Sequence, residues 1–189
     1  MDAVWIDVPE EFLEERARLG HDRKDELWEG VLHLVPPAAS PIHGFVAFNL
    51  CKVLTRFAER RGFVAYPDGI GIYAPEAEPA SWRIPDGAIA RPEQVSDRGL
   101  EGALLAVEVL SPRDESRKKF GFYARVGLTE VGLVDPKSRQ PENYTLLDGA
   151  FALVPPVHDV HRSPLLGITL RLVDGPRLQL RDDDDIAEI

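Results

Sequence analysis

Residues 103–126, ALLAVEVLSPRDESRKKFGFYARV, form the stretch that decides the expected fold. The first eight residues are an apolar run interrupted only by Glu108, a pattern typical of a strand buried on both faces. An ionised carboxylate left unpaired in such a setting costs several kcal/mol or has its pKa raised. The run therefore predicts a metal, a cation or a basic side chain near Glu108; the alternative is a glutamate at the solvated end of the strand.

The second half of the stretch predicts a helix that carries such a basic group. Ser111 followed by Pro112 is typical of an N-cap with proline at the first helical position. On a helical wheel Lys119 lies in the middle of an apolar stripe made of Phe120, Phe122, Tyr123 and Val126. We therefore expect Lys119 to face inward and to reach Glu108, either as part of a reactive site or as a plain buried ion pair.

The other basic residues of this helix lie off the stripe. Arg113, Arg117, Lys118 and Arg125 are expected on a solvated face, and Lys118 is expected to have no specific partner. A second basic run lies between Lys52 and Arg61. Both runs could steer a polyanion, although charged runs on helices are more often plain solvated surface. Arg113, Arg117 and Lys118 are the predicted nucleic-acid-binding residues.

Composition sets outer bounds on the class of protein. The chain of 189 residues, 44% hydrophobic and 29% charged, suits a single globular domain spanning residues 1–189. Its formal net charge of −10 argues against broad, non-specific adhesion to nucleic acid. The lone cysteine, Cys51, excludes an intramolecular disulfide and is expected to be a buried apolar residue. No leader or membrane-spanning run is evident, so we expect a cytoplasmic location without membrane association.

Taken in order, the chain alternates helical and strand patterns. A helix is predicted at 9–19, capped by Asp7 and ended by Gly20, followed by a hairpin at 26–35 turning at Glu29 and Gly30. Ser40 should cap a second helix from Pro41 to near Gly62. Strands are predicted at 63–66, 70–73, 82–90, 104–110 and 130–134. An added antiparallel portion should comprise 144–147, 151–154 and 170–173, with turns at 148–149 and 174–175.

Two acids stand on neighbouring predicted strands, and they define the candidate chemistry. Asp86 follows Pro85 directly, and Glu108 lies in the buried strand. Two such carboxylates can hold a hard divalent cation such as Mg²⁺, which takes oxygen ligands and keeps several waters. A lysine beside that cation can position a water while the metal stabilises charge on a phosphate oxygen. The pattern thus suits metal-dependent phosphodiester hydrolysis.

These residues and their neighbours carry a resemblance to a known family. The chain resembles the Uma2-type putative restriction endonucleases of the PD-(D/E)XK nuclease superfamily over roughly residues 24–137. The matching positions are Glu26-Leu27, Gly30, His43, Pro85-Asp86, Glu108 to Pro112, Lys119, Tyr123-Ala124-Arg125, Gly127, Glu130 and Val134-Asp135-Pro136. Where family members tend to carry an aromatic pair, this chain has Val131-Gly132.

The resemblance implies a fold and a set of roles. It implies an α/β, or mixed α+β, restriction endonuclease-like core with flanking helices and the added antiparallel C-terminal portion. It also implies Asp86 and Glu108 as catalytic ligands of Mg²⁺ or Mn²⁺, with Glu26 and His43 as accessory candidates. The superfamily lysine usually stands two residues after the acid, where this chain has Leu110. The resemblance suggests that Lys119 has taken over this catalytic role.

Three functional hypotheses follow. The first is a Mg²⁺-dependent endonuclease that hydrolyses DNA phosphodiester bonds, expected as a homodimer because cutting both strands needs two active sites. The second is a catalytically silent nuclease fold that binds nucleic acid or protein. The third is a two-carboxylate hydrolase of another substrate such as a glycoside. His158 and His161 are expected to be surface residues and not metal ligands.

Overall fold

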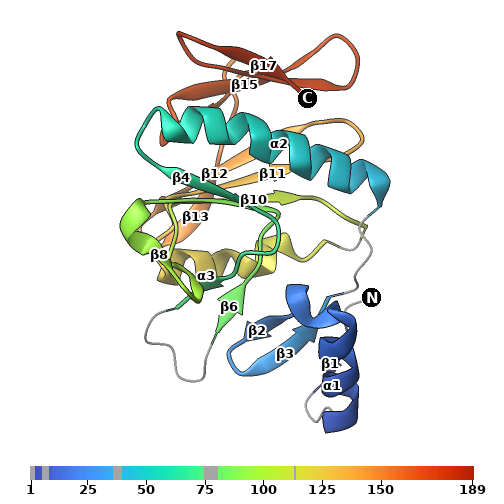
Figure 1. Cartoon of the computed structure of the whole chain (residues 1–189). Coiled ribbons are helices and arrows are strands. Elements are labelled where there is room, and N and C mark those ends of the chain that lie inside the picture. The colour runs from blue at the N-terminus through green and yellow to red at the C-terminus, as the bar shows by residue number, and fades with distance from the viewer. Residues whose placement is uncertain (1–2, 6–8, 36–39, 75–80, 113) are drawn as a thin grey trace.

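The computed structural model describes residues 3–5, 9–35, 40–74, 81–112 and 114–189. Within these residues the chain forms three α-helices and three β-sheets. Figure 1 shows how they are arranged. The helices are α1 (Glu10–Leu19), α2 (Pro41–Glu59) and α3 (Phe120–Arg125). The fold is thus mixed α/β, as the sequence predicts.

A six-stranded sheet forms the centre of the molecule. Its strand order is β13-β12-β11-β10-β7-β4, with bounds Ala150–Val154, Pro141–Leu147, Glu130–Val134, Leu105–Val109, Gly87–Ala90 and Val64–Pro67. The pair β10 and β11 is parallel, and every other pair is antiparallel, so the sheet is mixed. All five residues of β10 are buried, which confirms the doubly covered strand inferred from its apolar run.

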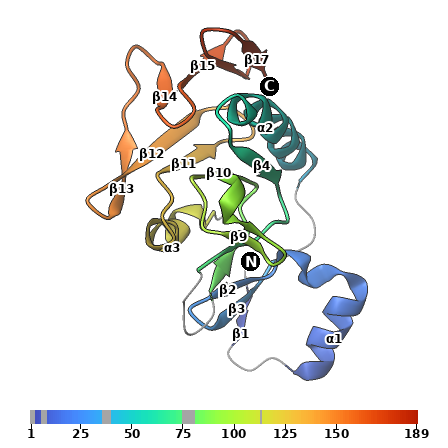
Figure 2. The same ribbon diagram turned by 60° about the vertical axis from the view of Figure 1, so that its left-hand side comes forward.

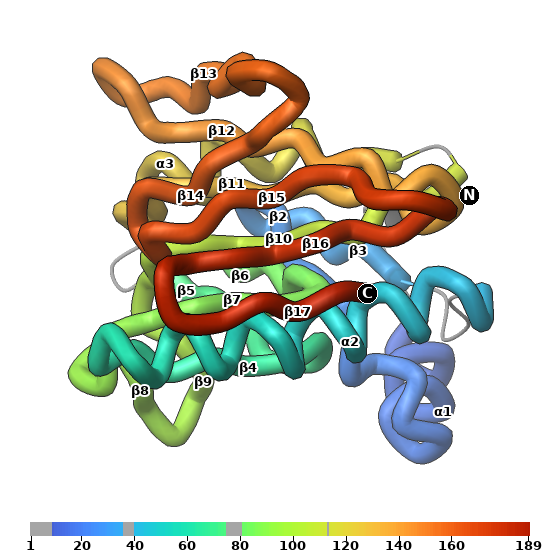
Figure 3. Tube along the Cα trace, turned by 90° about the horizontal axis from the view of Figure 1, so that it is seen from above, coloured from blue at the N-terminus to red at the C-terminus, as the bar shows by residue number. Residues whose placement is uncertain are grey.

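Alternation along β10 separates the two faces of this sheet. Leu105, Val107 and Val109 point into a core made with α2 and with a four-stranded C-terminal sheet. That sheet has the order β14-β15-β16-β17, with bounds His161–Ser163, Ile168–Val173, Arg177–Arg181 and Ile186–Glu188. Seen from above, its strands lie beside α2 over the central sheet (Figure 3). Ala106 points to the opposite face, where α3 contributes Phe122 and Tyr123.

A seven-stranded sheet carries the N-terminal half of the site. Its order is β1-β3-β2-β6-β5-β9-β8, with bounds Ala3–Trp5, Val31–Leu34, Glu26–Trp28, Trp82–Arg83, Ile72–Tyr73, Gly99–Glu101 and Val95–Ser96. The predicted hairpin is present, and Glu29 and Gly30 turn it with φ of 47° and 84°. Helix α1 extends away from the body and has no buried residue (Figure 2). It ends at Gly20 with φ 68°, as predicted, whereas its predicted cap Asp7 lies outside the described residues.

The prediction of one continuous strand at 82–90 is wrong. Strands β6 and β7 belong to different sheets, and the chain between them runs through Pro85. Proline has no N–H to donate to a ladder, and it therefore ends β6 where the chain crosses from one sheet to the other. This crossing places Asp86 at the junction of the two sheets.

The predicted start of the third helix at Pro112 is also wrong. The Asp114 carboxylate accepts hydrogen bonds from the N–H groups of Ser111 and Ser116 and from the Ser116 hydroxyl. Such a local side-chain cap offers the backbone an alternative to a helix. The chain then forms a 3-10 helix at Ser116–Lys119, and α3 begins only at Phe120.

The C-terminal third combines correct turns with a wrong grouping. Asp148 and Gly149, with φ of 50° and 83°, join β12 to β13, and the 174–175 turn joins β15 to β16, as predicted. However, β12 pairs with β11, so this hairpin extends the central sheet and is not a separate portion. The added antiparallel portion consists of the four strands from β14 onward.

Candidate active site

Three carboxylates from three strand segments define the candidate site. Glu108 lies in β10, Glu26 begins β2, and Asp86 lies just before β7. Glu108 and Ala106 are two residues apart on β10, so their side chains lie on the same face of the sheet, the face that α3 covers. Glu26 and Glu108 are 3% and 5% exposed, so neither carboxylate has more than a small opening to solvent.

Lys119 links two of these carboxylates. Its Nζ lies 2.9 Å from Glu26 Oε1 and 3.0 Å from Glu108 Oε1. Its side chain is 12% exposed, so it faces inward, as its place in the apolar stripe predicts. The lysine is therefore one cation between two buried acids from different sheets.

The electrostatics of the pair follow from burial and from these contacts. Burial raises the pKa of Glu108 to about 7, with the charge of Lys119 opposing the rise and the charges of Asp86 and Glu26 adding to it. Burial alone would lower the pKa of Lys119, but the charges of Glu108 and Glu26 outweigh it and raise that pKa. Lys119 thus stays protonated, while Glu108 is poised to exchange a proton near neutrality.

Tyr123 is a member of the site that the sequence analysis placed on the apolar stripe and among the family-like positions without giving it a role. Its hydroxyl donates a 2.6 Å hydrogen bond to Glu108 Oε1, and burial raises its pKa well above the ordinary value. A buried tyrosine normally needs a partner for its hydroxyl. Its place one helical turn after Lys119, on the same stripe, was the available signal.

Glu26 is fully engaged by its surroundings. Its Oε1 accepts from the Ile84 N–H at 2.8 Å as well as from Lys119, and its Oε2 accepts from Trp28 Nε1 at 2.7 Å. Arg83, 2% exposed, lies between the Trp28 and Phe122 rings at 4.4 Å from each centroid. This packing fixes β2 against β6, and the fully bonded Glu26 therefore acts as a support for Lys119.

His43 and Asp86 form the other side of the site. Ser40 caps α2 by accepting from the His43 N–H, as predicted. His43 Nε2 lies 2.8 Å from the Val109 carbonyl and 3.3 Å from Asp86 Oδ2, and that oxygen also accepts from the Val109 N–H at 2.7 Å. The Asp86 hydrogen bond raises the pKa of His43 against the opposing effect of burial. Because a carbonyl only accepts, Nε2 must carry a hydrogen, and His43 holds Asp86 in place.

Cys51, on α2, contacts the backbone of Asp86. Its Sγ lies 3.3 Å from the Asp86 carbonyl oxygen, and burial raises the pKa of the thiol to about 12. The thiol is therefore unreactive near neutral pH, but Cys51 is only half-buried and not fully buried as predicted. A Cβ at Gly87 would lie 2.6 Å from this sulfur, which requires glycine directly after Asp86.

The donor set of the site can be tested against a divalent cation. Protein donors contact Oδ2 of Asp86 and Oε1 of Glu108. Among the described residues no donor contacts Oδ1 of Asp86 or Oε2 of Glu108. No group of three or more His, Cys, Asp or Glu in this part of the chain is arranged to hold a metal. A pair of carboxylates with one open oxygen each still fits Mg²⁺, which commonly binds one or two carboxylates and keeps its waters.

Two of the predicted nucleic-acid-binding residues, Arg117 and Lys118, lie on an exposed face, as expected, but both have ion-pair partners. Lys118 is exposed but pairs with Glu115, so the prediction that it lacks a partner is wrong. Arg117 forms a 2.6 Å ion pair with Glu142 from β12. Arg113 lies outside the described residues. Glu142 from β12 and Glu115 from the preceding turn therefore neutralise the basic side chains of the 3-10 helix at Ser116–Lys119.

In the second basic run, at and beyond the C-terminal half of α2, the three arginines are neutralised in the same way, whereas Lys52 is exposed and has no ion pair within the described residues. Arg56 pairs with Asp185, and Arg60 lies 3.0 Å from Asp182 in the turn between β16 and β17. The acidic segment 182–185 therefore covers the basic side of α2. His161 is buried and not on the surface as predicted, and burial lowers its pKa.

Comparison with known proteins identifies the family. Residues 9–173 match the profile of the Uma2 family, described as putative restriction endonuclease. The chain belongs to the Uma2 family. A crystal structure of a putative nuclease belonging to DUF820 from Anabaena variabilis ATCC 29413 has the same fold, with a TM-score of 0.60 and 15% identity over 82% of this chain and 89% of that one. A search of curated proteins finds no match.

Family membership agrees with the resemblance carried by Asp86, Glu108 and Lys119. The Uma2 match extends beyond the residues 24–137 on which that resemblance was based, into β15. No helix of this Uma2 protein, within its described residues, is long and apolar enough to cross a membrane.

Proposed function

We propose that this Uma2 protein is a Mg²⁺-dependent endonuclease that hydrolyses DNA phosphodiester bonds. The observation that carries the proposal is Lys119, held between Glu26 and Glu108 at 2.9 and 3.0 Å, together with one carboxylate oxygen each of Asp86 and Glu108 that accepts from no donor among the described residues. A structural ion pair would satisfy its acids, whereas within the described part of the chain Asp86 and Glu108 each keep one acceptor oxygen without a donor.

Each residue then has a distinct role. Asp86 and Glu108 hold the cation, which when bound supplies charge stabilisation to a phosphate oxygen and lowers the pKa of a water. Lys119 positions the attacking water and stabilises the charge that develops on the phosphate. Glu26 and Tyr123 orient Lys119 and Glu108, and His43 orients Asp86.

A silent nuclease fold that binds a protein partner is the second candidate, and the ion pairing of the basic helices favours it. Arg56, Arg60 and Arg117 are all engaged by carboxylates, which leaves little free positive charge on those helices. Non-specific affinity for DNA rests mainly on such charges. The two candidates differ in their dependence on a divalent cation.

Calorimetric titration with Mn²⁺ and cleavage of supercoiled plasmid with Mg²⁺ separate these candidates. The wild type should bind Mn²⁺ and nick the plasmid, whereas Asp86→Asn should do neither while unfolding at a similar temperature. Asn keeps an oxygen for the Val109 N–H, so this variant tests the charge and not the hydrogen bond. Glu93→Gln, at an exposed carboxylate, is the matched control. Absence of heat with the wild type, or equal heat with Asp86→Asn, would leave the silent fold as the better account.

A further inference from the structure

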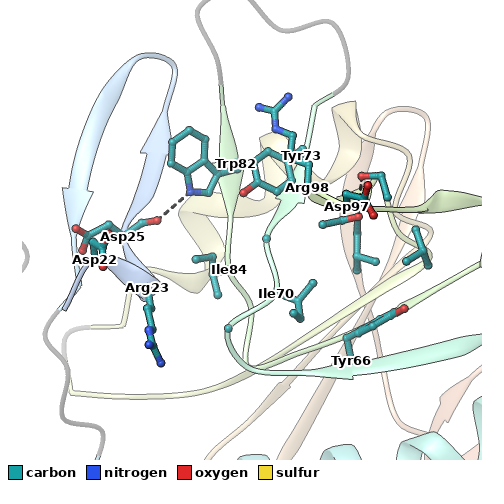
Figure 4. A pocket seen from close by; sticks show the side chains of 16 residues that line it. Asp22, Arg23, Asp25, Tyr66, Ile70, Tyr73, Trp82, Ile84, Asp97 and Arg98 are labelled. Atoms are coloured by element: carbon teal, nitrogen blue, oxygen red, sulfur yellow. Dashed lines mark hydrogen bonds between the residues drawn. The ribbon is translucent and has the colours of Figure 1, made fainter. Parts of the chain in front are cut away.

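An open cleft of about 340 Å³ lies beside the candidate active site. Its lining includes Asp25 and Ile84, which are the direct neighbours of Glu26 and Pro85-Asp86 in the chain. The Ile84 N–H donates to Glu26 at 2.8 Å, and Trp82 Nε1 donates to the Asp25 carbonyl at 2.9 Å (Figure 4). The same two segments therefore form a wall of the cleft and carry two of the site's acids.

Aromatic rings line this cleft in fixed positions. The Tyr73 and Trp82 rings meet with centroids 5.7 Å apart and planes tilted by 36°, and Tyr66 lies elsewhere along the same lining (Figure 4). A Cβ at Gly71 would lie 2.8 Å from the Tyr73 ring, and one at Gly99 would lie 2.7 Å from it. Glycine at both positions lets the backbone pack directly against the ring. These contacts hold the Tyr73 ring in place against the cleft wall.

The cleft also carries cations that are free of ion pairs. Arg98 lies with its guanidinium 4.3 Å from the Tyr73 centroid, and Arg23 lines the cleft near β2. Both arginines are exposed, and within the described residues neither lies in ion-pair distance of a carboxylate. This contrasts with Arg56 and Arg117, whose charges are neutralised. The lining also carries Asp22 and Asp97 beside these arginines, and Asp25, which is paired with Arg16. Arginines next to aromatic rings suit a phosphate that is attached to a planar ring.

We propose that this cleft binds one unpaired nucleobase of the DNA substrate, stacked on Trp82 beside Tyr73, with neighbouring phosphates on Arg23 and Arg98. Every base has a face that can stack on an aromatic ring, whereas a paired base inside a duplex cannot reach one. The carboxylates of Asp22 and Asp97, also in the lining, offer acceptors to exocyclic amino groups. This inference deepens the proposed function: the enzyme would act beside single-stranded, bulged or extruded bases.

The test is equilibrium binding in a chelating buffer, so that cleavage cannot interfere. The probes are a fluorescently labelled duplex with one extra unpaired adenine and the same duplex fully paired. Wild type should prefer the bulged duplex, and Trp82→Leu should weaken its binding about 5- to 100-fold while leaving the paired duplex unchanged. Trp82→Phe should keep most of the preference, because it keeps a ring for stacking.

A second set of variants guards against a folding defect in Trp82→Leu. Arg98→Gln, at an exposed residue, should reduce the slope of log K against log salt by about one for the bulged duplex. Arg162→Gln, an exposed arginine on β14 in the separate four-stranded sheet, is the matched control and should leave the preference for the bulge intact. Free dAMP, added as a competitor, should displace the bulged duplex only weakly because it lacks the flanking phosphates.

Equal binding of both duplexes by the wild type, or an unchanged preference in both Trp82→Leu and Arg98→Gln, would overturn the cleft assignment. Displacement by dAMP at concentrations equal to those of the DNA would instead make this a free-nucleotide site and would equally overturn it. The outcome is separable from the proposed function. Cleft-dependent binding without Mg²⁺-dependent nicking would remove the nuclease activity alone, and nicking without a bulge preference would remove the cleft alone.

Discussion

Replacing Glu108 by glutamine should abolish Mg²⁺-dependent cleavage and at the same time stabilise the metal-free protein at alkaline pH. Burial raises the pKa of Glu108 to about 7 from its ordinary value of 4.5. A difference in pKa converts to free energy at about 1.4 kcal/mol per unit, so the ionised carboxylate costs about 3 kcal/mol in the folded state. Glutamine resembles the protonated acid and still offers an oxygen to Lys119 and Tyr123.

The sign of the pH dependence follows from these two values. Below about pH 4.5 the carboxyl group is protonated in both the folded and unfolded states, so the substitution should change stability little. Between pH 4.5 and 7 the unfolded state releases the proton first, and the wild type loses stability as the pH rises. Above pH 7 the full difference of up to about 3 kcal/mol should remain in favour of Glu108→Gln.

Urea unfolding followed by circular dichroism at pH 5 and pH 8, with a chelator present, measures this difference. Glu93→Gln, at a side chain that is 71% exposed in the wild type, serves as the control and should be as stable as the wild type at each of the two pH values. Addition of Mn²⁺ at pH 8 should then stabilise the wild type and not Glu108→Gln, because a cation that binds the folded site raises its stability. A Glu108→Gln protein that is less stable than the wild type at pH 8 without metal would refute this account of the site.

Three further outcomes follow from the structure. Lys119→Met should lower the free energy of unfolding by about 3–5 kcal/mol, because it leaves Glu108 and Glu26 buried without a counter-charge. Lys118→Met, at an exposed residue, should change it by less than about 0.5 kcal/mol, and chemical denaturation of the two variants measures the difference. Burial raises the pKa of Glu130, so the protonated carboxyl is favoured in the folded state and the wild type loses stability as the pH rises from 4.5 through the folded pKa. Glu130→Gln can still accept from the Leu165 N–H and can donate to the Ser163 hydroxyl, and it should be more stable than the wild type at pH 8 in thermal melts. A homodimer is expected because cleavage of both strands of a duplex needs two active sites. Light scattering at micromolar concentration measures the mass, and the mass of a monomer would contradict this expectation.

The core of the site could be predicted from local sequence because its determinants are local. A buried apolar run with one acid identifies β10, and the spacing from Lys119 to Tyr123 identifies the inward stripe. The start of the helix could not be predicted in the same way. Ser111-Pro112 favours a helix that begins at Pro112, whereas Asp114 favours a local turn. The structure has the turn, because the Asp114 carboxylate accepts hydrogen bonds from the N–H groups of Ser111 and Ser116.

The acids that pair with the basic residues could not be predicted from the local sequence. Arg117 and Glu142 stand 25 positions apart, and Arg60 and Asp182 stand 122 apart. No periodicity links such residues, because the fold alone brings them together. The short strands β5, β8 and β9 were missed or misjudged in length for the same reason, since two or three residues pair only where distant neighbours supply the ladder. The assignment of residues 1–189 to one domain and the roles of the site residues stay predictions.

The position of the lysine has a structural consequence that a lysine on the strand would lack. A residue two places after Glu108 would share its face of β10, but Leu110 lies past the end of that strand and packs in the core beside α3. Lys119 approaches the same carboxylate from the layer that covers the sheet, and from there its ammonium also reaches Glu26 on β2. It thereby joins the seven-stranded sheet, the central sheet and the α3 layer at one point. The ammonium is therefore fixed before any substrate binds, and a change that loosens the docking of β2 should lower activity without touching Asp86 or Glu108.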